Sequence, residues 1–276
     1  MKFSVLMSIY HKEKAEYFNR AMLSIWDEQT IKPDEIVLVQ DGKLTGELYR
    51  SIEQWQEKLG DIFKTIPLEE NLGLGDALNI GLKECSYELV ARMDTDDICS
   101  SNRFEKQLKV FRDNDIDICS SWVSEFDSDE NKILSYRKLP KSHTDIVKFS
   151  KKRCPINHPA VMYKKSIIQD AGGYKKMIWF EDYYLWSRLI MYGAIFHNIQ
   201  EVLVNMRAGY GQLKRRSGFT YAISEINLQK QFFKIAFTNI FETTRNICIR
   251  FIVRILPKYL VKYIYIILRD KKEKDT

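Results

Sequence analysis

Apolar runs alternate with amphipathic segments along most of the chain, and the two patterns predict strands and helices in turn. The run Phe3–Ile9 is nearly continuous in apolar residues, which predicts a strand buried on both faces. Apolar residues at helical spacing over 15–28 predict a helix, and residues 35–39 predict a second strand. Strand, helix and strand at this spacing predict a βαβ unit with a right-handed crossover.

The same patterns continue along the chain and predict an α/β fold with a mostly parallel, Rossmann-like sheet flanked by helices. Further strands are expected over residues 63–67, 88–91, 116–126, 133–136, 160–163 and 196–204, with that at 133–136 antiparallel. Further helices are expected over residues 45–59, 76–85, 101–114, 143–151 and 166–170, and in a segment that ends near residue 192. Amphipathic helices are expected at the C-terminal end.

Acidic residues follow three of the predicted parallel strands. Glu13 comes after the first strand, Asp41 after the second, and Asp94, Asp96 and Asp97 after the fourth. The carboxyl ends of parallel strands meet at one edge of a sheet, so these side chains describe a cleft. Carboxylates this close repel one another and stay ionised together most easily around a hard divalent cation. A solvated turn would explain any single group, but it explains the recurrence at three strand ends less well.

The cysteines and the apolar runs limit the class of protein. Five scattered cysteines without a CxxC pair argue for free thiols in a reducing compartment, and against a disulfide framework or a zinc site. The N-terminus leads directly into a strand pattern without a cleavage site, so we expect no signal peptide. No uncharged apolar run approaches the ~20 residues that a membrane-spanning helix needs.

The formal net charge of +6 is concentrated at the C-terminal end. From Arg245 onward the chain has nine Lys or Arg against three acidic residues, an excess equal to the whole net charge. A nucleic-acid enzyme would spread its positive charge over the working domain, so nucleic acid is not an expected partner. Arg250, Arg254, Lys258 and Lys262 recur every four residues and form one stripe of a helix that Pro257 should kink.

A basic stripe beside a wide apolar face is typical of a helix that lies in the plane of an anionic membrane surface. Packing of this tail against the rest of the chain, or against a second copy in an oligomer, is the alternative.

Five motifs occur in order: VLMSIY at 5–10, VQDG at 39–42, NLGLGDALNIGL at 71–82, ARMDTDD at 91–97 and EDYYLW at 181–186. As a set they resemble those of an inverting family 2 glycosyltransferase with a GT-A fold, of the kind that builds bacterial O-antigen and exopolysaccharide repeat units. The resemblance covers roughly residues 3–220. It implies a catalytic domain over 1–220, with a nucleotide-sugar half near 1–100 and an acceptor half near 101–220. The basic, membrane-peripheral tail then occupies 221–276.

The resemblance implies a donor site for a UDP-sugar. Glu13 and Asp41 would hold the nucleoside, with Asp41 facing the uracil, and Asp94 would approach the ribose or the donor sugar. Asp96 and Asp97 would hold Mn²⁺ or Mg²⁺ between the donor phosphates. The remaining implied donor residues are Gly73, Gly75, Asp76, Arg92, Arg207, Arg215 and Arg216, and Arg103 lies close to a donor position of the family.

The resemblance also implies an acceptor site. Asp182 would be the base that deprotonates the attacking hydroxyl, and Glu181 would orient the acceptor or the base. His158 and Trp179 would bind the acceptor. The acid pair could instead be ordinary N-terminal helix charges, and a lone histidine is more often structural. Where the family often has His-Gly after Arg207, this chain departs from the pattern with Ala208-Gly209.

Together, these features predict a metal-dependent enzyme at the cytoplasmic face of the inner membrane. It would transfer a hexose from UDP-Glc, UDP-Gal or UDP-GalNAc to GalNAc- or GlcNAc-diphospho-undecaprenol, forming a β-linkage. A sugar nucleotidylyltransferase is an alternative, but it would have a glycine-rich loop after the first strand, where this chain has Tyr10-His11-Lys12-Glu13. A non-catalytic scaffold is another alternative, although every acidic motif position is present.

Overall fold

The computed structural model describes residues 1–208 and 218–255, with the side chains described as far as residue 251. Packing divides the chain into two compact units, one of residues 1–176 and 181–209 and one of residues 177–180 and 210–276. The boundary proposed near residue 220 stays a prediction.

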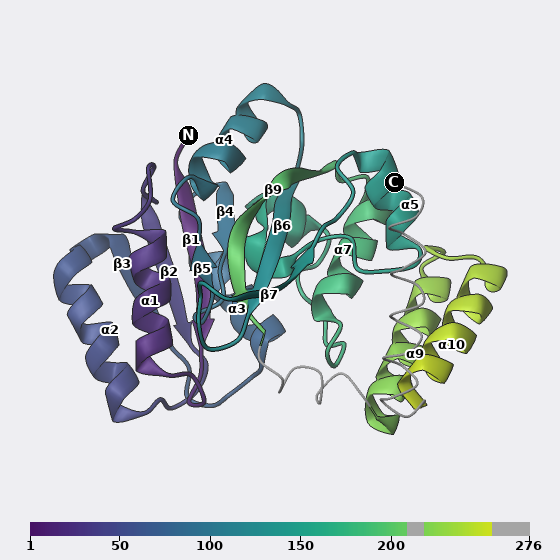
Figure 1. Cartoon of the computed structure of the whole chain (residues 1–276), viewed down its shortest axis with the longest axis horizontal. Coiled ribbons are helices and arrows are strands. Elements are labelled where there is room, and N and C mark those ends of the chain that lie inside the picture. Colours follow the sequence, from purple (N-terminus) through teal and green to yellow (C-terminus); the bar gives the residue numbers. More distant parts are fainter. Residues whose placement is uncertain (209–217, 256–276) are drawn as a thin grey trace. The chain divides into compact units, whose positions relative to one another are not determined.

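In the described part of the chain, nine strands form one sheet in the first unit, in the order β3-β2-β1-β4-β8-β6-β9-β5 with β7 beside β6 (Figure 1). The strands are β1 Phe3–Ile9, β2 Glu35–Gln40, β3 Phe63–Pro67, β4 Leu89–Arg92, β5 Ile98–Cys99, β6 Ile118–Phe126, β7 Ile133–Arg137, β8 Met162–Lys164 and β9 Phe196–Arg207. Strands β3, β2, β1 and β4 are mutually parallel, as are β6 and β9. The predicted α/β class with a mostly parallel sheet is therefore confirmed.

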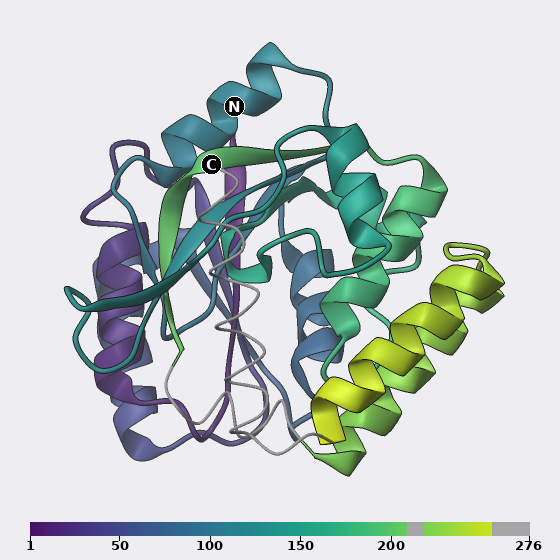
Figure 2. The same ribbon diagram turned by 45° about the vertical axis from the view of Figure 1, so that its right-hand side comes forward.

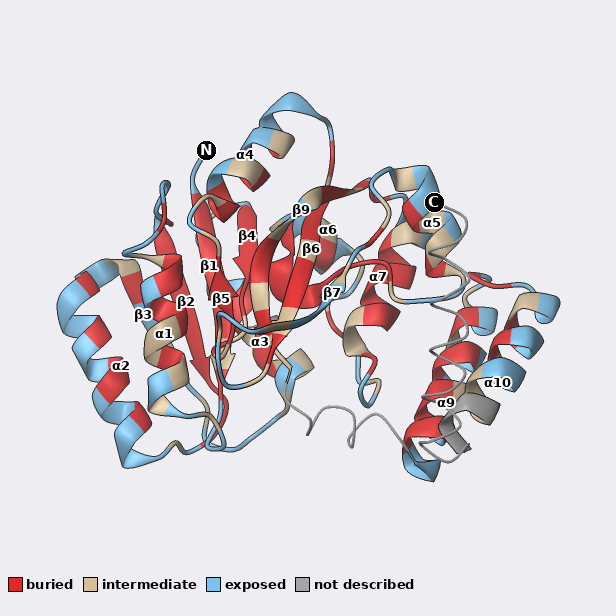
Figure 3. Cartoon of the chain, in the orientation of Figure 1, coloured by how far each residue is buried: buried red, intermediate tan, exposed pale blue. Residues whose placement is uncertain are grey.

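Helices cover both faces of this sheet (Figures 1 and 2). They are α1 Ala15–Ile25, α2 Gly46–Leu59, α3 Leu74–Glu84, α4 Arg103–Asp113, α5 His143–Ser150, α6 Lys165–Asp170 and α7 Glu181–Tyr192. Successive side chains of a strand point to opposite faces, so Val5 packs with residues of α1, α2 and α4, whereas Leu6 packs with residues of α3 and α7. Figure 3 shows the result: the strands are buried, and the helices that cover them are exposed on their outer faces.

Two differences from the predicted elements affect the edge of the sheet that carries the acidic residues. The two-residue strand β5, which no periodicity could indicate, follows the acid motif and pairs antiparallel with β9 at Ile98 and Cys99. Strand β9 continues beyond the predicted end at 204 to Arg207, because it pairs with β6 along its length. The acid motif therefore lies between β4 and β5, and the end of β9 holds β5 in place.

The described helices of the second unit are α9 Phe219–Lys234 and α10 Ile240–Ile255. They form an antiparallel hairpin, because Arg250 pairs with Glu225 while Asn246 Nδ2 donates to Gln229 Oε1 at 3.0 Å. Arg250 thus contributes to the hairpin, while the role of the basic stripe at a membrane stays a prediction. The side chain of Arg254, and Lys258 and Lys262, lie outside the described residues. Among the described helices, none is both long and apolar enough to cross a membrane.

Helix α3 packs very closely on the sheet at Gly81. A Cβ atom at this position would lie 2.5 Å from Leu6 Cδ1 and 2.6 Å from Val39 Cγ2. We predict that Gly81→Ala destabilises the protein by about 1–3 kcal/mol, because both neighbours are buried strand residues with little room to move. Urea unfolding would measure this. Gly46→Ala is the matched control, since nothing lies within 4 Å of its Cβ position. An equal loss in both variants would contradict the prediction.

Candidate active site

The predicted donor carboxylates of Glu13 and the acid motif lie together at the carboxyl edge of the sheet. Thr95 Oγ1 donates to Glu13 Oε2 at 3.1 Å, which joins the loop after β1 to the motif after β4. Burial raises the pKa of Glu13, and the negative charge of Asp94 raises it further. Burial likewise raises the pKa of Asp96 to about 7, with Asp94 and Glu13 as the next contributors. Three carboxylates therefore share one partly desolvated region, as the sequence predicted.

Two arginines that are buried in the core hold the acid motif in place. Arg92 is 1% exposed and binds Asp94 through both terminal nitrogens, with Nη1 at 2.6 Å from Oδ2. Arg103 is fully buried and donates from Nη2 to the Arg92 carbonyl at 2.8 Å, and from Nε to Gln107 Oε1 at 3.0 Å. Arg103 therefore binds backbone and amide oxygens instead of an aspartate. Its placement near a donor position reflects a role in fixing the end of β4.

Asp97 points toward the end of β9. Its Oδ1 accepts a hydrogen bond from the backbone N–H of Arg207 at 2.7 Å, whereas its buried Oδ2 has no hydrogen-bond partner in the described part of the chain. Burial holds the pKa of Asp97 well above its usual range, and the charges of Asp94 and Asp96 act in the same direction. An unpartnered buried carboxylate oxygen is costly, so a cation at this position would satisfy it.

These residues fit a divalent cation whose remaining ligands come from a bound substrate. Among the described side chains, no group of three or more His, Cys, Asp or Glu is arranged to hold a metal ion by itself. Mg²⁺ in nucleotide sites, however, is usually bound by one or two carboxylates together with substrate phosphates and water. Asp96, with its raised pKa, and Asp97, with its orphaned oxygen, supply the oxygen donors that such an ion needs.

Asp41 holds the glycine loop that precedes α3. Its Oδ1 accepts from the N–H of Leu72 at 2.7 Å and its Oδ2 from the N–H of Gly73 at 3.1 Å. Gly42 is required beside it, because its φ is +84° and a Cβ would lie 2.8 Å from Asn71 N. Both carboxylate oxygens of Asp41 are thus engaged in the structure, although a carboxylate oxygen can accept a second donor.

The same loop borders a hollow of about 420 Å³ lined by Leu68, Glu69, Glu70 and Leu72. Because Asp41 binds the N–H of Leu72, this hollow adjoins the position that the sequence assigned to the nucleoside.

The first turn of α3, which follows the glycine loop, lies against Glu181, which the sequence assigned to the acceptor side. A Cβ on Gly75 would lie 3.4 Å from Tyr174 Cβ and 3.5 Å from Glu181 Cγ, so the first turn of α3 lies against the first residue of α7 at ordinary van der Waals separations. Asp76, in the same turn, forms an ion pair with the exposed Lys176 at 3.3 Å.

Asp182 lies in the first turn of α7. Its Oδ1 accepts from the N–H of Tyr183 at 2.7 Å, and its Oδ2 lies 3.8 Å from Cys154 Sγ. Burial raises the pKa of the Cys154 thiol to about 12, with the Asp182 charge as the second cause, so the thiol is a neutral donor. Tyr183 Oη donates to the Ser150 carbonyl at 2.6 Å and fixes α7 against the end of α5. The carboxylate of Asp182 is positioned by contacts on both sides.

His158 is packed in the interior of the first unit. Its Nε2 lies 2.8 Å from Tyr174 Oη, and its ring packs edge-on against Trp186 with centroids 5.9 Å apart. Burial, followed by the positive charge of Arg92, lowers the pKa of His158 well below its usual range, so the imidazole is neutral at pH 7. Trp179 belongs to the second unit, where its ring lies 5.3 Å from that of Tyr221, and it is 44% exposed.

Arg207, at the end of β9, supports the acid motif. Its guanidinium lies 3.8 Å from the ring centroid of Tyr17 and 4.6 Å from that of Phe126. Its Nε donates to the Asp96 carbonyl at 3.2 Å, and its Nη1 donates to the Asp127 carbonyl at 3.1 Å. Arg215 and Arg216, which the sequence assigned to the same loop, lie outside the described residues.

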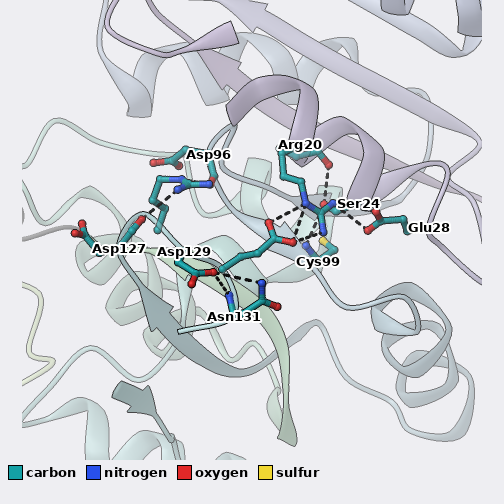
Figure 4. A network of polar contacts seen from close by, with 11 residues as sticks. Arg20, Ser24, Glu28, Asp96, Cys99, Asp127, Asp129 and Asn131 are labelled. Carbon is teal, nitrogen blue, oxygen red and sulfur yellow. Dashed lines mark hydrogen bonds and ion pairs between the residues drawn. The ribbon is translucent and has the colours of Figure 1, made fainter. Parts of the chain in front are cut away.

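Figure 4 shows polar contacts near the acid motif, with Asp96 and Asp127 on one side, and with Asp129 and Asn131 hydrogen-bonded to each other near Arg20 and Glu28. Arg20 binds both Glu28 and Glu130, each at about 3 Å. The turn between β6 and β7 is thereby tied to α1, close to the residues that carry the acid motif.

The sequence did not single out Asn79 and Tyr174. Asn79 Oδ1 accepts from the N–H of Tyr174 at 2.7 Å, and Asn79 Nδ2 donates to the Tyr174 carbonyl at 2.8 Å. A Cβ on Gly173 would lie 2.5 Å from Asn79 Oδ1. The Gly172-Gly173 pair was a visible signal of a tight turn, but its partner lies about 95 positions earlier in the chain.

Comparisons with known proteins bear on the family and the fold. The family model described as glycosyl transferase family 2 matches residues 4–170. A UDP-Gal:alpha-D-GlcNAc-diphosphoundecaprenol beta-1,3-galactosyltransferase of Escherichia coli is 43% identical over 265 residues, covering 96% of this chain and 95% of the relative. The amylovoran biosynthesis glycosyltransferase AmsE of Erwinia amylovora is 37% identical over 264 residues, covering 95% and 97%.

Among solved structures, a mannosyltransferase from Pyrobaculum calidifontis in complex with GDP-Man and Mn²⁺ superposes with a TM-score of 0.62 at 16% identity. The superposition covers 84% of this chain and 64% of the other. At this low identity, the likeness bears on the fold alone.

The raised pKa of Asp97 predicts a pH-dependent stability. In the absence of divalent ions, the folded protein holds a proton on Asp97 that the unfolded chain loses near pH 4, so the free energy of unfolding falls as pH rises above about 4. Asp97→Asn should remove this loss and be more stable relative to the wild type at about pH 8 than at about pH 5. Urea unfolding in EDTA would measure the difference. The exposed Asp113→Asn should show no such change, and a pH-independent effect of Asp97→Asn would contradict the prediction.

Proposed function

The chain belongs to glycosyl transferase family 2, and from this membership we propose that it transfers a hexose from a UDP-sugar to a lipid-linked GlcNAc- or GalNAc-diphosphate acceptor with inversion, forming a β-linkage. The observation that carries the proposal is the 43% identity, over nearly the whole of both chains, to a galactosyltransferase named for such a donor and acceptor. UDP-Gal is therefore the first donor to test, with UDP-Glc and UDP-GalNAc as alternatives. The product would be a repeat unit of an O-antigen or exopolysaccharide.

On the donor side, the glycine loop and Asp41 place the nucleoside, and Asp94, oriented by Arg92, accepts hydrogen bonds from hydroxyls of the ribose or donor sugar. Asp96 and Asp97 would hold Mn²⁺ or Mg²⁺, which would supply positive charge to the leaving diphosphate. Glu13 completes the negative side of the cleft. Arg207 fixes the carbonyl of Asp96 with its Nε and the carboxylate of Asp97 with its backbone N–H.

On the acceptor side, the carboxylate of Asp182 takes the proton of the attacking hydroxyl. The hydroxyl oxygen forms a bond to the anomeric carbon of the donor sugar while the bond from that carbon to UDP breaks on the opposite face. An α-linked donor therefore yields a β-linked product. Glu181, which lies against Gly75, orients the acceptor at the boundary between the two sides.

The proposed location is the cytoplasmic face of the inner membrane. The second unit has large apolar side chains on its surface, and Phe241 is the most exposed at 83%. The others among its described side chains are Ile178, Trp179, Phe219, Ile223, Phe233, Ile240 and Ile249. Exposed apolar side chains next to a strongly basic C-terminal sequence suit an anionic lipid surface.

Transfer to the lipid-linked acceptor should depend on Asp182. We predict that Asp182→Asn lowers kcat by about 10²–10⁴-fold, because the amide cannot accept the proton, while the affinity for UDP is kept. Transfer from each UDP-sugar to a detergent-dispersed GlcNAc-diphosphate lipid, and calorimetric UDP binding, would measure the two effects. Asp170→Asn, which changes an exposed residue, is the control. Full activity of Asp182→Asn would show that another group is the base.

Divalent cations should be required for transfer. We predict that EDTA abolishes activity and that Mn²⁺ or Mg²⁺ restores it. In Asp96→Asn, the increase in UDP affinity that Mn²⁺ produces should be smaller by about tenfold or more. Titration of Mn²⁺ against UDP binding would test this. Undiminished transfer in EDTA would exclude a metal role for Asp96 and Asp97.

The basic residues beyond α10 should contribute to membrane binding. We predict that protein ending at Ile255, which keeps the hairpin of α9 and α10, floats less with phosphatidylglycerol vesicles than the full chain does, because it lacks the basic segment that follows. Thermal unfolding of both proteins would control for damage to the first unit. Equal flotation would assign the tail to packing instead.

A further inference from the structure

The first unit has a basic segment that none of the roles above uses. Residues 137–153 contain seven Lys or Arg and a single acidic residue, Asp145. The basic residues are Arg137, Lys138, Lys141, Lys148, Lys151, Lys152 and Arg153. This segment runs from the end of β7 through α5 to the residue before Cys154. It is a concentration of positive charge separate from the C-terminal tail.

Three contacts bring both ends of this segment to the proposed base. Arg137 Nη2 donates to the carbonyl of Cys154 at 3.2 Å. Cys154 Sγ in turn lies 3.8 Å from Asp182 Oδ2. From the neighbouring residue of α7, Tyr183 Oη donates to the Ser150 carbonyl at 2.6 Å, which fixes the start of the basic turn 151–153. Arg137 and this turn are therefore anchored next to Asp182.

Arg137 and Arg153 have no carboxylate within ion-pair distance among the side chains that the structure describes. Elsewhere in the same unit, Arg20, Lys64 and Lys164 are paired with acids. Arg137 is also half-buried, so its charge has lost part of its hydration without a partner of opposite charge. A guanidinium in this situation is suited to bind an anion, and its planar donors match phosphate oxygens.

We propose that Arg137 and the basic turn 151–153 form the binding site for the diphosphate of the acceptor. This inference rests on the proposed function, in which the acceptor hydroxyl lies at Asp182. In a sugar linked through its anomeric carbon to a diphosphate, one ring separates that hydroxyl from the first phosphate. Cations that are anchored next to the base, one or two contacts away, therefore lie where the acceptor's phosphates arrive. The donor diphosphate, by contrast, is assigned to Asp96 and Asp97 at the other side of the cleft.

Phosphate groups of membrane lipids share this chemistry. The half-burial of Arg137 and its link through Cys154 to Asp182 favour the acceptor, because a headgroup site needs exposed side chains and no relation to the base. The turn 151–153 then adds charge that holds the second phosphate. Such a site would explain how an enzyme of this kind selects a sugar that is already attached to its lipid carrier.

The test compares Arg137→Gln, Arg153→Gln and the control Lys109→Gln, an exposed lysine of α4. The acceptor is a GlcNAc-diphosphate lipid in detergent, without vesicles. We expect each arginine variant to raise the KM for the acceptor by about 10-fold or more, and to change the KM for the UDP-sugar far less, because charge-assisted hydrogen bonds to the acceptor are lost. Arg137→Lys should recover part of the loss, and Lys109→Gln should behave as the wild type.

Thermal unfolding midpoints and phosphatidylglycerol vesicle flotation of the same variants complete the test. An unchanged acceptor KM in detergent, with reduced flotation, would assign the cations to membrane phosphates and overturn the proposal. Unchanged KM and unchanged flotation would mean a solvated surface and would also overturn it. If Arg137→Gln unfolds early, the exposed Arg153→Gln decides by its acceptor KM. If the wild type transfers sugar to no diphosphate-linked acceptor, the proposed function itself fails. If the wild type transfers sugar and the variants keep its acceptor KM, only the proposed site fails.

Discussion

The structure depends on keeping several carboxylates together at one edge of a largely buried sheet. Burial and mutual repulsion both raise the pKa values of Glu13, Asp96 and Asp97. The buried guanidinium of Arg92 offsets part of this by binding Asp94 at both oxygens. Removing one partner of such a pair would leave an uncompensated buried charge. In the proposed function, the metal ion bound with the diphosphate would supply positive charge to the rest of the acidic cluster.

A second layer of side chains holds this cluster in place without belonging to it. Arg103 binds the backbone of Arg92 from inside the core, and Arg207 binds the backbone of Asp96 from the end of β9. Asp41 holds the glycine loop by two backbone N–H groups. Several residues of types that often contact ligands thus act on the backbone. Such fixed surroundings matter, because a site loosened by about an ångström loses much of its catalytic advantage.

Two contacts link α3 to the segment that leads into α7. Glu181 packs against the first turn of α3 at Gly75, and Gly173 lets Asn79 bind both backbone groups of Tyr174. Tyr174 then reaches the neutral ring of His158. These contacts hold the start of α7, which carries the proposed base, against the first turn of α3. In the proposed function, the basic segment anchored near Asp182 would extend this side of the site toward the acceptor's anionic end.

The sequence by itself determined the alternation of strands and helices, the class of fold, and the strand ends that carry acidic residues. These depend on periodicity within single elements, and Phe3–Ile9 and Phe63–Pro67 were predicted to the residue. It also determined the family, because five motifs occur in order. Only the tertiary structure decided that Asp97 binds the N–H of Arg207, 110 positions away, and that Arg250 pairs with Glu225 inside a hairpin. Such partners are chosen by the packing of distant elements, and no local pattern of residues records that packing.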